Sequence, residues 1–257
     1  MNCILCSVFY QEKYIEMFLI LLESIITYGQ LDNNTEILIY TSTNFMEKIK
    51  QNSIFDSEKI KFEINDKYNS VFEASAARLD VFSFNCIKNY SKILYLDTDV
   101  IIKEDINKVF DICKEDVVYA LEEGSIDKYT DHGQTLFKDK DEINSYKDKS
   151  GFSAGVLLFN NCVIIKDLFD EIKKDINKRP NNFPCLEQPY IVYNCFKQKL
   201  YNNKDFKKYV VITSGNEDDI GSDKVVFHFA GGPGNYNRKL IKMLKFLESL
   251  KKTRPKL

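Results

Sequence analysis

Short apolar runs alternate, over the first hundred residues, with longer segments in which apolar residues recur every three or four positions. The runs predict strands at residues 3–9, 36–40 and 60–64, and a fourth strand that ends at Asp97. The periodic segments predict helices at 13–28, which Gly29 ends, at 44–51 and at 72–85. Such alternation is typical of a three-layer α/β fold with a mostly parallel central sheet, in which ligands bind at the carboxyl ends of the strands.

The second half of the chain continues the pattern less regularly. A polar segment at 127–150 has no clean period, and we expect a long loop there that contributes to the active site. Further elements are expected as a strand at 152–159, a helix at 163–177, a break at 179–184, a helix at 186–196, a strand at 225–229 and a helix at 236–252. Because no repeat or linker divides the chain, we expect residues 1–257 to form a single domain.

The fourth strand contains the most informative local feature. Residues 92–102 form an apolar run that is interrupted by Asp97 and Asp99. In an extended segment these two side chains point to the same side, and two neighbouring carboxylates repel each other unless a cation lies close. A hard divalent metal that carries a phosphorylated ligand would satisfy them. Helix caps or exposed loop acids are the alternative interpretation.

A second feature lies far along the chain. His228 ends a predicted strand, and a glycine-rich turn at 231–234 follows. Neutral imidazole is a good ligand for manganese, and glycines let backbone amides approach phosphate oxygens. Taken alone, a lone histidine is more often structural than a metal ligand, and a plain turn explains the glycines as well as a phosphate-binding turn does.

Several motifs together resemble the ordered signatures of glycosyltransferase family 8, the group of glycogenin and the bacterial lipopolysaccharide galactosyltransferases. They are AARL at 76–79, LYLDTD at 94–99, FSAGVLLFN at 152–160, EQ at 187–188 and HFAG at 228–231. The resemblance covers nearly the whole chain. It implies a GT-A fold and a retaining transfer of a hexose-type sugar from a UDP-sugar donor to a glycan, protein or lipid-linked acceptor.

The same resemblance implies roles for individual residues. A divalent ion, Mn²⁺ or Mg²⁺, would be held by Asp97, Asp99 and His228. The catalytic residues would be Gln188, beneath the anomeric carbon, with Asp97, Asp99 and Arg78. The remaining positions match those where the family binds the nucleotide sugar: Ser7, Val8, Tyr14, Arg78, Thr98, Ser153, Ala154, Gln188, Gly231 and Gly234.

The chain departs from its relatives at two positions. Gly234 stands where close relatives place a lysine that reaches the diphosphate, and Arg238 or Lys239 could replace it. Pro189 follows Gln188, where some relatives keep a polar group. An amide such as Gln188 is a weak nucleophile, so the sequence favours front-face transfer over a covalent intermediate, with the neighbouring Glu187 as the alternative nucleophile.

Composition limits the partners and the cellular locations that we expect for the protein. Its 257 residues carry 36 basic and 38 acidic side chains, so no global charge indicates nucleic acid as a partner. No apolar run reaches the roughly 18–20 residues that span a bilayer, and seven scattered cysteines indicate free thiols and a cytoplasmic location. The lysines of the last helix leave a peripheral membrane contact open beside an ordinary solvated face, and a homodimer also stays open.

Two other functions compete with sugar transfer. Asp97-Thr98-Asp99-Val100 also fits the first motif of haloacid-dehalogenase-type phosphatases, with Asp97 as nucleophile. That motif belongs on a first strand, however, and here about three strands precede it. The third interpretation is a non-catalytic protein that binds a sugar nucleotide.

Overall fold

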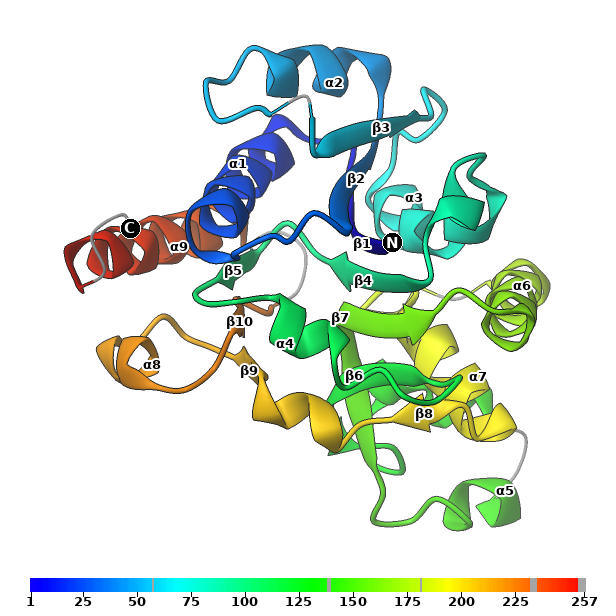
Figure 1. The fold of residues 1–257 in the computed structure, drawn as a ribbon. Helices are drawn as coiled ribbons and strands as arrows, with labels where there is room; N and C mark the ends of the chain where they lie inside the picture. The colour runs from blue at the N-terminus through cyan, green and yellow to red at the C-terminus, as the bar shows by residue number, and fades with distance from the viewer. Residues whose placement is uncertain (57, 138–139, 181, 232–234, 254–257) are drawn as a thin grey trace.

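The computed structural model describes residues 1–56, 58–137, 140–180, 182–231 and 235–253. Strands and helices alternate through much of the chain (Figure 1). The strands are β1 (Asn2–Val8), β2 (Thr35–Thr41), β3 (Ile60–Ile64), β4 (Lys92–Leu96), β5 (Val100–Ile102), β6 (Val118–Ser125), β7 (Ser150–Asn160), β8 (Tyr201–Asn202), β9 (Val210–Ile212) and β10 (Val226–His228). The helices are α1 (Glu12–Tyr28), α2 (Thr43–Lys50), α3 (Val71–Ala76), α4 (Asn107–Phe110), α5 (Lys140–Asn144), α6 (Val163–Lys178), α7 (Gln188–Gln198), α8 (Glu217–Gly221) and α9 (Tyr236–Thr253).

Seven of the strands in the described ranges form one sheet in the order β3-β2-β1-β4-β7-β6-β8. All neighbours pair in parallel except β7, which runs antiparallel to both β4 and β6. The expected mostly parallel central sheet is therefore confirmed. The carboxyl ends of β1 and β4 meet at one edge, and Ser7 and Asp97 lie there.

Helices cover both faces of this sheet and make three layers (Figure 1). Along β1, Cys3 and Leu5 pack into the core shared with α6 and α7, whereas Ile4, Cys6 and Val8 pack into the core shared with α1 and α2. This period of two is what a strand buried on both faces requires. Cys3 and Cys6 therefore face opposite sides of the sheet, and both thiols are free.

A second, three-stranded sheet was not expected from the sequence. It has the order β5-β10-β9, and β10 pairs antiparallel with β5. The strand expected at 225–229 therefore exists, but it belongs to this small sheet. Helix α9 covers the sheet with the buried residues Met243, Phe246, Leu247 and Leu250, which also pack on α1. Its apolar stripe thus closes the fold.

Three further expectations need correction. The helix expected at 72–85 ends at Ala76 and continues as a 3₁₀ helix, Ala77–Ser83. This 3₁₀ segment buries Ala77, Arg78, Leu79 and Val81. These residues would not all lie on one face of an α-helix. The 127–150 segment is partly ordered, with 3₁₀ turns Thr130–His132 and Gln134–Leu136 before α5. Strand β6 went unpredicted.

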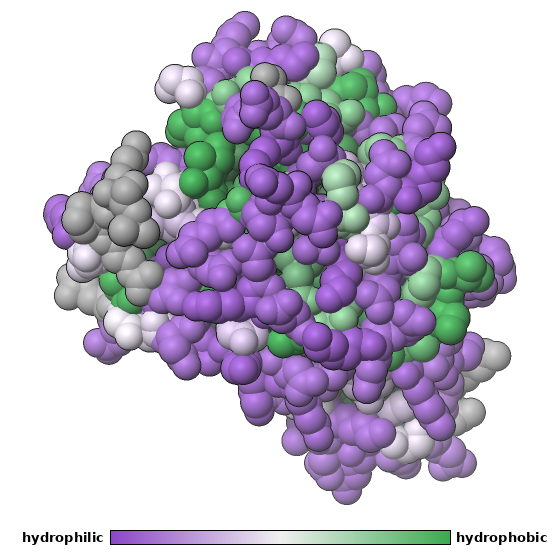
Figure 2. Space-filling view, viewed as in Figure 1, coloured by the Kyte–Doolittle hydropathy of each residue, from purple (hydrophilic) through white to green (hydrophobic). Residues whose placement is uncertain are grey.

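The face of the molecule seen in Figure 2 is mostly hydrophilic. None of the helices in the described residues combines the length and the apolar character that a membrane crossing needs. On α9, Ile241 and Leu244 are exposed beside the lysines. The membrane contact and the homodimer stay predictions.

Candidate active site

The two aspartates lie in a turn between β4 and β5, at the carboxyl edge of the main sheet. The Asp97 amide donates to the Gly155 carbonyl of β7 at 2.8 Å, and the Asp99 carbonyl accepts from the Phe229 amide at 2.9 Å. The extended geometry expected from the sequence is therefore wrong, because the chain turns at Thr98. The carboxylates converge nonetheless. The Asp99 side chain is buried, whereas that of Asp97 is 29% exposed.

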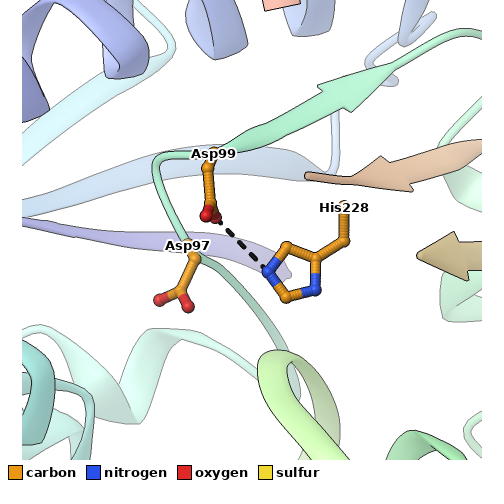
Figure 3. A group of neighbouring side chains, drawn as sticks. All are labelled: Asp97, Asp99 and His228. Atoms are coloured by element: carbon orange, nitrogen blue, oxygen red, sulfur yellow. Dashed lines mark ion pairs between the residues drawn. The ribbon is translucent and has the colours of Figure 1, made fainter. Parts of the chain in front are cut away.

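His228 reaches the aspartates through strand pairing. Because β10 pairs with β5, His228 stands opposite Val100, one residue after Asp99. Its Nε2 atom lies 3.4 Å from Asp99 Oδ1 (Figure 3). One ligand atom from each of Asp97, Asp99 and His228 can be chosen so that all three lie within 4.8 Å of one another. The small sheet thus joins residues 129 positions apart into one candidate metal site.

This donor set fits a divalent cation. Two carboxylates and an imidazole are ligands that manganese accepts, and the buried Asp99 Oδ1 has no hydrogen-bond partner among the described residues. Gly155 forms the floor of the site, since a Cβ there would lie 2.2 Å from His228 Cε1 and 3.0 Å from Asp97 Oδ2. The space beside the ligands is therefore kept open by the sequence. Any larger residue at position 155 would fill it.

Charge around Asp99 favours its ionised form. Burial disfavours the charge, but His228 and Lys239 outweigh burial and hold the pKa of Asp99 well below its usual range. At His228, burial alone would lower the pKa. The neighbouring Asp99 outweighs burial, so the pKa of His228 is raised. Lys239 Nζ bonds Asp99 Oδ2 and the Gly231 carbonyl, both at 2.6 Å. Of the two residues that could replace the family lysine, Lys239 thus points into the site, whereas Arg238 is exposed.

Arg78 is a buried cation behind the aspartates. Its guanidinium lies 2.9 Å from Asp97 Oδ1 and 3.1 Å from Glu187 Oε1, and it stacks 4.4 Å from the Tyr95 ring centre. It also donates to the Ala154 carbonyl. The side chain is 5% exposed, so these contacts replace its hydration completely.

Two adjoining cavities share Arg78, Asp97, Asp99, Gly231 and Lys239. The tyrosine cavity, of about 130 Å³, is lined further by Ser7, Phe9, Tyr14, Tyr95, Thr98 and Tyr236. The glutamine cavity, of about 230 Å³, is lined further by Glu123, Asp131, His132, Ser153, Ala154, Gly155, Cys185, Glu187, Gln188 and His228.

Most residues named from the sequence meet in these cavities. Gln188 accepts from the Ala154 amide at 2.9 Å and donates to the Asp131 carbonyl at 3.1 Å. Val8 is the exception, since its side chain is buried in the apolar core and its carbonyl accepts from Thr41. Gly234 lies outside the described residues.

Sequence reasoning missed several cavity residues. Glu123 lies on the unpredicted strand β6, and Asp131 and His132 lie in the segment taken for a loop. Tyr236 was seen only as the start of a helix, but its hydroxyl lies 3.1 Å from that of Tyr14 at the mouth of the tyrosine cavity. The rarity of histidine, with two in the chain, was the one available signal for His132.

The buried His132 should make the unfolding stability of the protein depend on pH. Burial lowers its pKa from 6.5, so the folded protein holds this imidazole neutral. Its stabilising contribution is then complete above pH 6.5 and is lost as the pH falls below that value. We expect urea unfolding to show that wild type loses more stability than His132→Gln between pH 7.5 and 5.5. An equal loss in both proteins would contradict the prediction.

The fold is the GT-A fold of glycosyltransferases. The family model described as Glycosyl transferase family 8 matches residues 6–233, most of the chain. The chain therefore belongs to glycosyl transferase family 8. A search of curated proteins finds no match to it.

Solved structures resemble the chain in fold. The galactosyltransferase LgtC, in complex with donor and acceptor sugar analogs, matches with a TM-score of 0.63 and 15% identity, over 98% of this chain and 96% of LgtC. The apo bifunctional enzyme WbbM matches with a TM-score of 0.61 and 16% identity, over 98% of this chain but 51% of WbbM, so the chain spans about half of that protein. A glycosyltransferase involved in glycosylation of the PBCV-1 major capsid matches with a TM-score of 0.59 and 14% identity, over 95% and 98% of the two chains.

The phosphatase alternative does not hold. The aspartates follow the fourth strand in chain order, and the chain belongs to a glycosyltransferase family. His228, which that alternative left without a role, lies against Asp99.

Proposed function

We propose that this glycosyltransferase is metal-dependent and retaining, and that it moves a hexose-type sugar from a UDP-sugar to a glycan, protein or lipid-linked acceptor. The observation that carries the proposal is the Asp97–Asp99–His228 group above the Gly155 floor. A divalent ion held there would act as a Lewis acid that neutralises the leaving diphosphate. Manganese and magnesium both prefer such oxygen-rich sites, and the imidazole favours manganese.

Both cavities suit the two ends of such a donor. In the tyrosine cavity, the hydroxyl of the buried Ser7 has no hydrogen-bond partner within the described ranges, and Tyr14 and Tyr236 offer ring faces and hydroxyls to a nucleoside. In the glutamine cavity, Gln188 is fixed by two hydrogen bonds next to Ser153 and Ala154. We assign the nucleoside to the first cavity and the donor sugar to the second.

The site also supports a reaction without a protein nucleophile. Glu187, the alternative nucleophile, is 1% exposed, and its carboxylate is engaged by Arg78 and Ser75. Gln188 carries no charge and is held by hydrogen bonds on both sides of its amide. Transfer on one face of the sugar, with Arg78 and Lys239 stabilising charge on the leaving group, agrees with this arrangement.

Binding and turnover test the proposal in turn. We expect the melting temperature to rise with UDP and manganese together, and to rise little with either alone or with inorganic phosphate. A screen of UDP-hexoses should then find a donor that is hydrolysed in the presence of manganese and spared in excess chelator. Metal-dependent UDP binding without turnover of any donor would favour the non-catalytic alternative, and hydrolysis in chelator would contradict the metal.

Gly155→Ala should damage the metal site without removing a ligand. The added Cβ would lie 2.2 Å from His228 Cε1, a distance that forces the imidazole or β7 to move. Displacing a supporting group typically weakens metal binding about 10–100-fold, and we expect that range for manganese in titration calorimetry. Gly221→Ala is the matched control, because a Cβ there meets nothing within 4 Å. Equal manganese affinity in both variants would remove the Gly155 floor from the proposal.

Lys239 is proposed as the contact to the diphosphate that Gly234 cannot make. Its ammonium now neutralises Asp99, so Lys239→Met should tighten manganese binding in the absence of nucleotide. The same variant should bind UDP about tenfold or more weakly in the presence of manganese, because it loses a hydrogen bond between charged groups. Lys242→Met, one helical turn nearer the end of α9, is the control. If Lys239→Met changed the affinities for manganese and for UDP in the same direction, Lys239 would not both neutralise Asp99 and contact the diphosphate.

A further inference from the structure

One wall of the glutamine cavity has no role in the donor site as proposed. Glu123 comes from β6, and Asp131 and His132 come from the 3₁₀ turn that follows it. Between Glu123 and Ser125 the pairing with β7 skips Gly124, which has a φ of +54°. Such bulges redirect side chains, and this one accompanies the turn of Glu123 into the cavity. Within the described residues, the Glu123 carboxylate has no hydrogen bond or ion pair.

His132 is held against the sheet by two glycines. A Cβ on Gly124 would lie 2.4 Å from His132 Nε2, and one on Gly151 would lie 2.8 Å from Nδ1. The side chain is 4% exposed, and its buried Nδ1 atom has no hydrogen-bond partner in the described part of the chain. A buried imidazole normally has partners for its polar atoms, so this one points to a ligand that completes them.

Asp131 extends the same pattern and connects it with the reacting centre. Its Oδ1 atom is also buried and accepts no hydrogen bond from the described residues. Its carbonyl accepts from Gln188 Nε2 at 3.1 Å, and Gln188 Oε1 accepts from the Ala154 amide. The wall formed by Glu123, Asp131 and His132, here called the acid–histidine wall, therefore adjoins the residue beneath the proposed donor sugar.

We propose that the acid–histidine wall binds the acceptor, and that the acceptor presents uncharged sugar hydroxyls there. This inference rests on the proposed function. Carboxylates only accept hydrogen bonds, so Glu123 and Asp131 require hydroxyl or amine donors. A neutral imidazole offers one donor and one acceptor, which matches a hydroxyl group on both counts.

Charge excludes an anionic acceptor at this wall. Glu123 and Asp131 add two carboxylates to a cavity that Asp97, Asp99 and Glu187 already line. Arg78 and Lys239, the cations of this cavity among the described residues, lie with the aspartates and Glu187. A carboxylate or phosphate on the acceptor would meet like charges without a nearby counterion, and such contacts reject partners.

Two substitutions with a neighbouring control test the assignment. Glu123→Gln and Asp131→Asn keep the shapes of the side chains, and Glu122→Gln changes the adjacent residue, which pairs with Lys207 on the opposite face of the sheet. Donor cleavage is measured as hydrolysis by water and as transfer to methyl glycosides that are neutral, carboxylated or amine-bearing. Thermal unfolding checks that each variant is folded.

We expect wild type to prefer the neutral glycosides. In Glu123→Gln and Asp131→Asn, the KM for the neutral glycoside should rise about tenfold and the ratio of transfer to hydrolysis should fall, whereas Glu122→Gln should match wild type. An unchanged ratio in both variants, a preference for the carboxylated glycoside, or no transfer to any neutral glycoside would overturn the acceptor assignment alone. Absence of donor hydrolysis and of metal-dependent UDP binding in wild type would instead overturn the proposed function, and the acceptor site with it.

Discussion

Asp99→Asn is expected to reduce sugar transfer by about a thousandfold and to abolish the effect of manganese on UDP binding. A Lewis acid on a leaving diphosphate contributes several kcal/mol to the transition state, and each 1.36 kcal/mol is a factor of ten in rate. Of the proposed ligands, Asp99 is the one that the structure isolates most completely, since it is buried, ionised and aimed at both His228 and Lys239. An amide of the same shape keeps the packing and removes the charge.

The measurement is donor turnover together with UDP titration in manganese and in chelator. Asp223→Asn is the control, because that side chain is 89% exposed and lines neither of the two cavities. The variant and wild type should bind UDP equally in chelator, so the difference between them should appear when manganese is added. Turnover within tenfold of wild type would show that Asp99 is not an essential metal ligand.

The sequence predicts the elements of this site better than it predicts their arrangement. Apolar runs and periodic segments located β1 to β4 and α1, since each is buried along a continuous run or on one stripe. The family motifs named Arg78, Gln188 and His228, and all three line the glutamine cavity. The pairing of β10 with the three-residue β5 was beyond sequence reasoning, because short strands carry little periodic signal.

The acid–histidine wall shows the same limit on a smaller scale. The segment after β6 is polar and aperiodic, so it was interpreted as a loop, and nothing local marks His132 as buried. Its burial depends on Gly124 and Gly151, which lie on two different strands and leave room for the imidazole. Such a fit is a property of tertiary packing. The turn at Thr98 is a similar case. The sequence correctly predicted that the Asp97 and Asp99 side chains converge, but it did so from an extended backbone that the structure does not have.

Arg78→Met is expected to lower the free energy of unfolding by about 3–5 kcal/mol and to remove activity. Removing one partner of a buried ion pair leaves the other charge without compensation, and here both Asp97 and Glu187 lose their partner. Arg78→Lys should rescue part of the stability, because an ammonium keeps the charge but cannot contact both carboxylates and the Ala154 carbonyl in the guanidinium geometry. Urea unfolding measures the first effect and donor turnover the second.

Adding manganese and adding a second substitution distinguish the stability loss at Asp97 from the loss at Glu187. Manganese should restore part of the unfolding free energy that Arg78→Met loses, since an ion on Asp97 replaces one lost charge. It should not restore the loss that comes from the unpaired Glu187. Combining Arg78→Met with Glu187→Gln should recover most of that second part, because the buried charge is then gone, while turnover stays low for lack of the cation. If the double variant were as unstable as Arg78→Met alone, the loss would come from packing against Tyr95 and not from unpaired charge.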